Sequence, residues 1–103
     1  MNKNLNTIIE FEMADGTKVN MTLNYFALYQ LKAKKTKTYD EYNKIMAQGV
    51  KEELDMALIL YTAYLCANLE EECVDYEEFL QNLPVDRWTV RATVGALTTP
   101  KKR

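Results

Sequence analysis

The chain has 103 residues, of which 13 are basic and 15 acidic, with two cysteines and no histidine. This length suits one compact domain, and 48% hydrophobic with 27% charged residues is the composition of an ordinary folded protein. Without histidine, histidine-based catalytic triads and Cys/His zinc sites are excluded. We expect a single α+β domain over residues 1–97, an N-terminal antiparallel β-hairpin at 7–23, four to five helices within 24–97, and a flexible basic tail at 98–103.

The hairpin is predicted by two segments that alternate polar and apolar residues, TIIEFEM at 7–13 and TKVNMTL at 17–23. Between them, Asp15 and Gly16 supply the positive φ that a tight turn needs. One face of this hairpin should therefore be apolar.

The first helix is expected to begin after an Asn24 cap, to run to about Lys35, and to bury Tyr25, Leu28 and Leu31. Its end is basic, and lysines there complement the helix dipole. The basic residues of this region are Lys32, Lys34, Lys35 and Lys37.

A second, short helix is predicted from a capping box in which Thr38 is the N-cap and Glu41 the N3 residue, with Gly49 closing the helix. A third helix should run from Val50 to about Leu69. Its residues 56–69 carry no charge, but this stretch is shorter than the roughly 20 residues that span a bilayer. Because the third helix is apolar nearly all round, we expect it to be central or shared with another molecule.

Asp75 and Glu78 form a second capping box, with Val74 and Phe79 at the spacing of a hydrophobic staple. The resulting fourth helix should stop at Leu83, before Pro84. A fifth helix is expected from Arg87 to about Leu97, although β-branched residues in the Thr89–Leu97 stretch also allow a strand.

The cysteines, Cys66 and Cys73, are seven residues apart around the end of a helix, too far to bridge along an intact helix. Reduced, partly buried thiols are expected, as in a cytoplasmic protein. Residues 1–13 alternate in polarity and carry two glutamates, so we expect no export signal.

No pattern predicts a catalytic, metal or cofactor site. The acidic run EEECVDYEE at 70–78 lacks the glycine and spacing of a calcium loop, and the three glycines are scattered singly rather than forming a phosphate loop. We therefore expect function through surface contact. The third helix offers tyrosine and leucine side chains suited to a partner or to self-association, namely Leu58, Tyr61, Tyr64 and Leu65.

Several segments in order resemble the tail assembly chaperones of long-tailed, siphovirus-type phages and prophages of Gram-positive bacteria. They are the N-terminal hairpin, LNYFALYQLK at 23–32, ALILYTAYLCAN at 57–68, YEEFL at 76–80 and the tail TPKKR. The resemblance implies a non-enzymatic factor without a cofactor. Such a factor binds the tape measure protein in the host cytoplasm and helps to recruit tail tube subunits, and many members also have a longer frameshifted form.

An alternative is a small nucleic-acid-binding or regulatory protein of a mobile element, acting through Lys32, Lys34, Lys35 and Lys37. The net charge of −2 argues against a strong general attraction to nucleic acid. An enzyme is the third possibility, for which the sequence places no site. Oligomeric state is left open.

Overall fold

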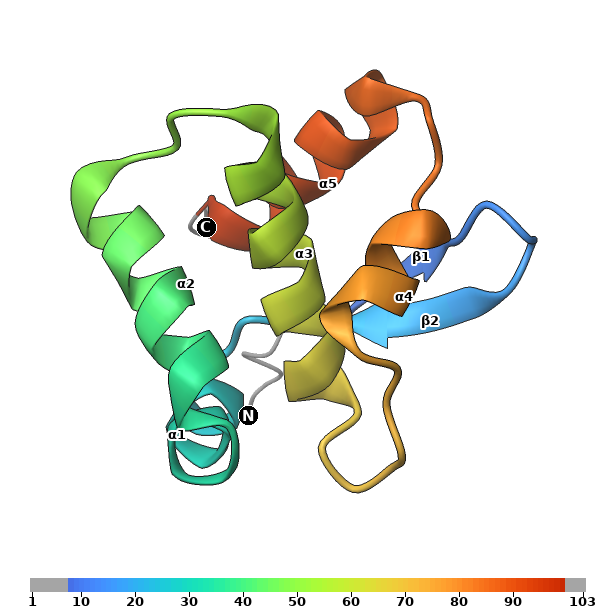
Figure 1. Cartoon of the computed structure of the whole chain (residues 1–103). Helices are drawn as coiled ribbons and strands as arrows, with labels where there is room; N and C mark the ends of the chain where they lie inside the picture. Colours follow the sequence, from blue (N-terminus) through green and yellow to red (C-terminus); the bar gives the residue numbers. More distant parts are fainter. Residues whose placement is uncertain (1–7, 100–103) are drawn as a thin grey trace, which may run out of the picture.

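The computed structural model describes residues 8–99 and confirms an α+β fold, a two-stranded antiparallel hairpin followed by five helices (Figure 1). The strands are β1 (Ile9–Glu12) and β2 (Lys18–Met21), and the helices are α1 (Tyr25–Lys34), α2 (Thr36–Gln48), α3 (Glu53–Ala67), α4 (Tyr76–Gln81) and α5 (Arg87–Thr98). None of these helices is long and apolar enough to cross a membrane.

The hairpin has the predicted turn and the predicted apolar face. Ile9 pairs with Met21 and Phe11 with Val19, so apolar side chains face each other across the strands. Gly16 adopts a φ of 90°, which favours glycine, and the amide of Thr17 donates to the Asp15 carboxylate at 2.9 Å. Thr7, the first residue of the predicted hairpin, lies outside the described residues.

Helix α1 begins as predicted, because the Asn24 side chain accepts a hydrogen bond from the amide of Ala27 at 2.8 Å. The predicted start of α2 at a Thr38 cap is wrong. Helix α2 begins at Thr36, directly after Lys35, the residue that separates it from α1. Thr38 therefore lies inside the first turn, where the amide of Tyr39 already bonds to the Lys35 carbonyl at 3.1 Å. The helix is also longer than expected, with 13 residues, and ends at Gly49 as predicted.

Helix α3 begins at Glu53, three residues later than the predicted Val50. The preceding residues carry the chain across from the end of α2, and Glu52 is still extended. The amide of Lys51 donates to the Asp55 carboxylate at 2.8 Å, so the first turn of α3 holds this connection in place. The helix ends at Ala67, two residues before the predicted end.

The last two helices begin at aspartate caps. Asp75 accepts from the amide of Glu78 at 2.9 Å, as predicted, although α4 ends at Gln81 rather than Leu83. The segment 87–98 is a helix and not a strand: Asp86 caps it, and Val90 and Val94, one turn apart, are buried. Thr98, expected in the tail, is the last residue of α5, whereas residues 100–103 lie outside the described part.

The hydrophobic core is centred on α3, which lies between α2 on one side and α4, α5 and the hairpin on the other (Figure 1). Nine residues of α3 are buried, namely Ala57 and the unbroken run from Ile59 to Cys66. Backbone bonds also tie the layers together, since the amide of Thr22 donates to the Ala63 carbonyl at 3.1 Å. The prediction of a central apolar helix is confirmed.

Candidate interaction surface

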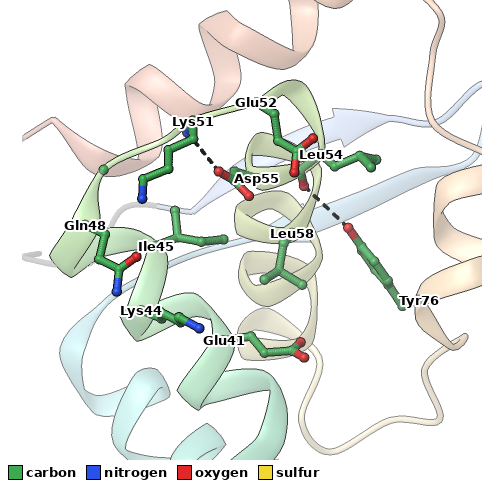
Figure 2. Close-up of a pocket in the computed structure, with 11 residues that line it drawn as sticks. Glu41, Lys44, Ile45, Gln48, Lys51, Glu52, Leu54, Asp55, Leu58 and Tyr76 are labelled. Atoms are coloured by element: carbon green, nitrogen blue, oxygen red, sulfur yellow. Dashed lines mark hydrogen bonds between the residues drawn. The ribbon is translucent and has the colours of Figure 1, made fainter.

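A hollow of about 470 Å³ lies between α2 and α3, and it contains Leu58, one of the four side chains predicted to contact a partner (Figure 2). Ile45 and Leu54 supply the rest of its apolar lining. Leu58 is half-buried, whereas Leu54 is 57% exposed. A partner side chain can therefore reach Leu58 from this side.

The rim of this hollow carries charges of both signs, from Glu41, Lys44, Glu52 and Asp55 among others. The Tyr76 hydroxyl donates to the Leu54 carbonyl at 3.5 Å, which brings the start of α4 to the edge of the hollow (Figure 2). Opposite charges around an apolar floor produce little net field, so this hollow does not select strongly for the charge of a ligand.

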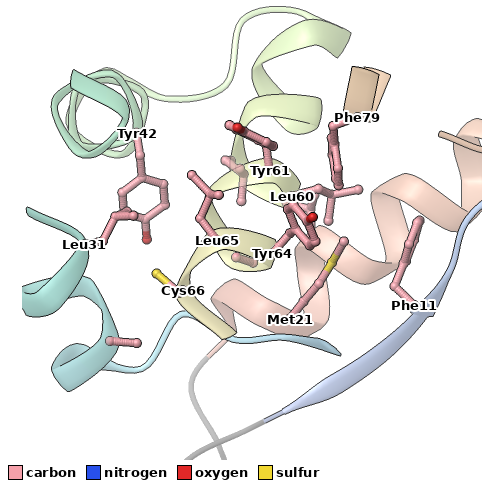
Figure 3. Close-up of a cluster of buried hydrophobic side chains, with 14 of the residues drawn as sticks. Phe11, Met21, Leu31, Tyr42, Leu60, Tyr61, Tyr64, Leu65, Cys66 and Phe79 are labelled. Carbon is pink, nitrogen blue, oxygen red and sulfur yellow. The ribbon is translucent and has the colours of Figure 1, made fainter. Parts of the chain in front are cut away.

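The other three predicted contact residues, Tyr61, Tyr64 and Leu65, lie in the core (Figure 3). Their exposed fractions are 8%, 9% and 2%. The rings of both tyrosines lie against Phe79 of α4, with centroids 5.2 and 5.3 Å away. The expected role of these side chains is therefore corrected: they pack the interior and are not accessible to a partner in this structure.

The hydroxyls of the two buried tyrosines hold the backbone just before α4. Tyr61 donates to the Val74 carbonyl at 2.9 Å, and the Val74 amide donates to the Tyr64 hydroxyl at 3.1 Å. Both backbone polar groups of Val74 are thus satisfied by core side chains. Burial raises the pKa of Tyr61 to about 12 and also raises that of Tyr64.

Both cysteines are free, as predicted, with Cys66 buried and Cys73 half-buried. Burial raises the pKa of Cys66 to about 12 and also raises that of Cys73. Because the thiolate is the reactive form of cysteine, these environments oppose nucleophilic chemistry. Residues 8–99 also contain no group of three or more cysteine, aspartate or glutamate side chains placed to hold a metal ion.

The most exposed aromatic surface lies on α1, and the sequence prediction missed it. Tyr25 is 89% exposed, Phe26 68% and Tyr29 72%, and the rings of Phe26 and Tyr29 are stacked with centroids 6.4 Å apart. We call these three side chains the aromatic face of α1. The expectation that Tyr25 is buried is wrong; of the three residues predicted to be buried, Leu31 is fully buried and Leu28 half-buried.

Helical geometry explains this exposure. At about 100° per residue, the aromatic face points away from Ala27 and Leu31, which α1 buries against the core. The spacing 25, 26, 29 therefore marks a separate stripe from 27 and 31. Sequence alone shows two apolar stripes on one helix but not which of them is covered.

Beside the aromatic face runs a groove between α1 and α2 that reaches the end of α5. Two adjoining hollows, of about 410 and 300 Å³, share Tyr25, Leu28, Tyr42 and Met46. We call this the α1–α2 groove. Its remaining lining residues are Leu23, Tyr29, Lys32, Tyr39, Asn43, Leu97, Thr98 and Thr99.

The four lysines of the basic run are all exposed around the α1–α2 junction. Lys34 pairs with Glu70 at 3.7 Å, so part of the charge is balanced within the fold. The Lys32 ammonium lies 5.7 Å from the centroid of the Tyr39 ring. The basic run is thus available at the surface but is not a uniform cationic patch.

A second exposed apolar site lies near the start of α5, where Val85 is 95% and Trp88 74% exposed. Neither residue lines the α1–α2 groove or the hollow at Leu58. Substitutions of Val85 and Trp88 can therefore serve as controls when the aromatic face of α1 is tested by mutation.

Comparisons of this chain with protein-family models, with curated proteins and with solved structures give no match.

Proposed function

We propose that this protein is a non-enzymatic phage tail assembly chaperone that binds the tape measure protein in the host cytoplasm and assists tail tube assembly. The single observation that carries the proposal is the aromatic face of α1, where Tyr25, Phe26 and Tyr29 are exposed together. The resemblance of residues 23–32, 57–68 and 76–80 to this family gives the identity of the client.

Exposed aromatic rings are the side chains that most favour protein–protein contact. Tyrosine and phenylalanine are enriched at the centres of interfaces, and burying apolar area gains about 25 cal/mol per Å². A tape measure protein is long and apolar, so a chaperone needs exposed apolar surface and no reactive side chain. The aromatic face meets this need, and the raised pKa values of the two thiols are consistent with it.

The proposal is tested by co-expressing this chain with a tape measure protein of a siphovirus-type phage or prophage and measuring how much of that protein stays soluble and co-purifies. We expect the wild-type chain to keep it soluble. The triple variant Tyr25→Ser, Phe26→Ser, Tyr29→Ser should lose most of the co-purified protein while its circular dichroism spectrum stays native.

The matched control is the double variant Val85→Ser, Trp88→Ser, which removes exposed apolar area elsewhere and should retain the client. If the tape measure protein is equally insoluble with and without the wild-type chain, the proposed function is wrong.

The alternative function, nucleic-acid binding, is favoured by the exposure of four lysines around the α1–α2 junction, namely Lys32, Lys34, Lys35 and Lys37. It predicts retention of DNA at low salt that falls steeply as salt rises. The double variant Lys35→Gln, Lys37→Gln should then weaken retention. An absence of retention at low salt would contradict this alternative.

A further inference from the structure

We propose that the outer edge of β1 binds an extended segment of another protein as a third strand, and that Glu10 and Glu12 select a segment with basic side chains at alternate positions. This edge is separate from the aromatic face of α1, so the inference goes beyond the proposed function and does not depend on it. The observations that support it are the direction of the unpaired backbone groups, the cover that α3 gives to the opposite edge, and the charges of the open face.

Alternate residues of the hairpin direct their backbone groups away from the partner strand. The amide of Met13 donates to the Thr17 carbonyl at 2.7 Å, which makes these two residues a hydrogen-bonded pair beside the turn. Bonded and non-bonded pairs alternate along an antiparallel ladder, so Glu10 and Glu12 belong to the non-bonded pairs. The N–H and C=O groups of Glu10 and Glu12 therefore point out from the free side of β1, and those of their partners in β2 point the other way.

The edge of β2 is covered by α3. The Asn20 carbonyl accepts a hydrogen bond from the Asn68 side chain at 3.2 Å, and the amide of Thr22, just beyond β2, donates to the Ala63 carbonyl at 3.1 Å. These bonds confirm that the even-numbered residues of the hairpin direct their backbone groups outward. A further strand can therefore add beside β1, whereas α3 occupies the position beside β2.

The edge of β1 has no such cover within residues 8–99. No described residue outside the hairpin forms a hydrogen bond with the backbone of Glu10 or Glu12. Both residues are exposed, whereas Phe11 between them points into the core and is 3% exposed (Figure 3). A row of unpaired groups at a strand edge is a template for another extended chain, because a strand offers a donor and an acceptor at every second residue. The backbone pattern thus fits a strand and not a helix.

The open face of the hairpin is acidic. Glu10 and Glu12 stand on this face with one residue between them. Glu10 also lines a hollow of about 360 Å³ together with Glu71 and Glu72, which lie between α3 and α4. Among the described residues that line this hollow, Lys18 is the only basic one. Opposite charges directly across two strands stabilise the pair, so lysine or arginine at alternate positions of the incoming strand matches the pattern.

A second copy of this chain fits the edge poorly. An antiparallel contact that joins the free backbone groups of two β1 strands pairs even-numbered residues with each other, so a glutamate of one copy lies directly opposite a glutamate of the other. Like charges in that position destabilise a strand pair. The basic run at 32–37 lies in α1, in α2 and at their junction, so it is not an extended segment. The charge pattern therefore favours a segment of another protein.

The first test measures charge selection with two fluorescein-labelled peptides of nine residues that alternate valine with polar residues. They differ only at two central polar positions, which are lysine in one peptide and glutamate in the other. By fluorescence anisotropy with the full chain, we expect the lysine peptide to bind roughly tenfold more tightly, because two cross-strand pairs change from repulsive to attractive. Glu10→Lys with Glu12→Lys should reverse this preference.

Backbone methylation separates strand addition from simple charge attraction. Two further versions of the lysine peptide carry N-methyl groups on alternate residues, one at the odd positions and the other at the even positions. Alternate N–H groups of a strand point to opposite edges, so only one of the two sets faces β1. We expect one methylated peptide to bind like its parent and the other to lose at least about tenfold in affinity.

Amide hydrogen exchange followed by NMR locates the bound strand. In the free chain the amides of Glu10 and Glu12 should exchange quickly, whereas the amide of Phe11 should be protected by the hairpin ladder. Saturating lysine peptide should slow exchange at Glu10 and Glu12 by at least about tenfold.

A proline at position 10 tests the edge from the side of this chain. Glu10→Pro should remove most of the binding and leave the hairpin folded, because proline is tolerated where the N–H faces away from the neighbouring strand. Glu10→Gln is the matched control, since it keeps the N–H and should lose only the share of affinity that the charge contributes. Circular dichroism checks that both variants are folded.

Three outcomes would overturn the inference: the lysine peptide does not bind at millimolar concentration, the two methylated peptides bind equally, or the amides of Glu10 and Glu12 stay unprotected in the complex. Two others would overturn it by identifying a different occupant. A dimer in sedimentation that Glu10→Pro dissociates would identify a second copy, and a gain in peptide affinity on deletion of residues 100–103 would identify that basic segment of the chain itself.

These outcomes are separable from the proposed function. The triple variant of the aromatic face should bind the lysine peptide like the wild type, and Glu10→Pro should still keep the tape measure protein soluble. Loss of strand binding alone would therefore reject the edge and retain the chaperone, and loss of solubilisation alone would do the reverse.

Discussion

Helices α3 and α1 are both rich in leucine and tyrosine, yet they use tyrosine in opposite ways. Tyr61 and Tyr64 of α3 are 8% and 9% exposed, whereas Tyr25 and Tyr29 of α1 are 89% and 72% exposed. Helix α3 is packed by the hairpin strand β2 and by every other helix, while α1 packs against α2 and α3 only. The position of a helix in the fold, more than its composition, decides whether a tyrosine is core or surface.

The tyrosines of α3 and those of α1 also differ in what their hydroxyls require. A buried hydroxyl must find a hydrogen-bond partner, and Tyr61 and Tyr64 find theirs at the backbone of Val74. An exposed hydroxyl is satisfied by water, so Tyr25 and Tyr29 leave their rings free for another molecule. Substitutions in the two helices should therefore separate stability from binding.

The largest effect on stability is expected for Phe79→Ala, beside the buried tyrosines. Phe79 is 1% exposed, and truncating such a core ring costs about 3–5 kcal/mol of the free energy of unfolding. Phe26→Ala on α1 should change the free energy of unfolding by less than about 0.5 kcal/mol. Urea denaturation measures both. Equal losses in the two variants would contradict the assignment of α1 as surface.

A smaller loss is expected when only the buried hydroxyls are removed. Tyr61→Phe and Tyr64→Phe should each cost about 1–3 kcal/mol, because a polar group of Val74 is left without its partner. Tyr29→Phe is the matched exposed variant and should have almost no effect. If Tyr61→Phe is as stable as the wild type, the bond to Val74 contributes nothing measurable.

Alkaline pH should destabilise the protein through the same buried region. The pKa of Cys66 is raised from 9.0 and that of Tyr61 from 10.0, each to about 12, so the folded state holds these protons when the unfolded state has lost them. The contribution of these two groups to the free energy of unfolding should be fully present below about pH 9 and should fall progressively from pH 9 to 12.

Urea midpoints at pH 8, 9.5 and 10.5, under reducing conditions, measure this fall. In Cys66→Ala the loss of stability that begins near pH 9 should be smaller, since the buried thiol is then absent. A midpoint that is constant up to pH 10.5 would show that burial does not hold these protons in place.

The smallest effect on stability is expected for Tyr25→Ser. Its side chain is almost fully exposed at the first residue of α1, and Asn24 continues to cap the helix. We expect a change within about 0.5 kcal/mol, measured by urea denaturation. A loss of 2 kcal/mol or more would mean that Tyr25 packs against the fold after all.

The sequence determined the features whose partners lie within a few residues along the chain. The turn at Asp15 and Gly16, the caps Asn24 and Asp75 and the end of α2 at Gly49 are local hydrogen-bond and dihedral requirements. They appear as predicted because no distant contact is needed to satisfy them. The central position of α3 was also predictable, since a helix apolar all round must be covered.

Only the tertiary structure decided which apolar stripe is covered on each helix and which is left exposed. Segment 87–98 is helical because Val90 and Val94 pack into the core, a contact that outweighs the β-branched composition. Thr38 lost its expected role because Lys35 lets α2 begin directly after α1. Tyr61 and Tyr25 are chemically the same residue, and their opposite environments arise from neighbours that are distant in the sequence, which no local pattern specifies.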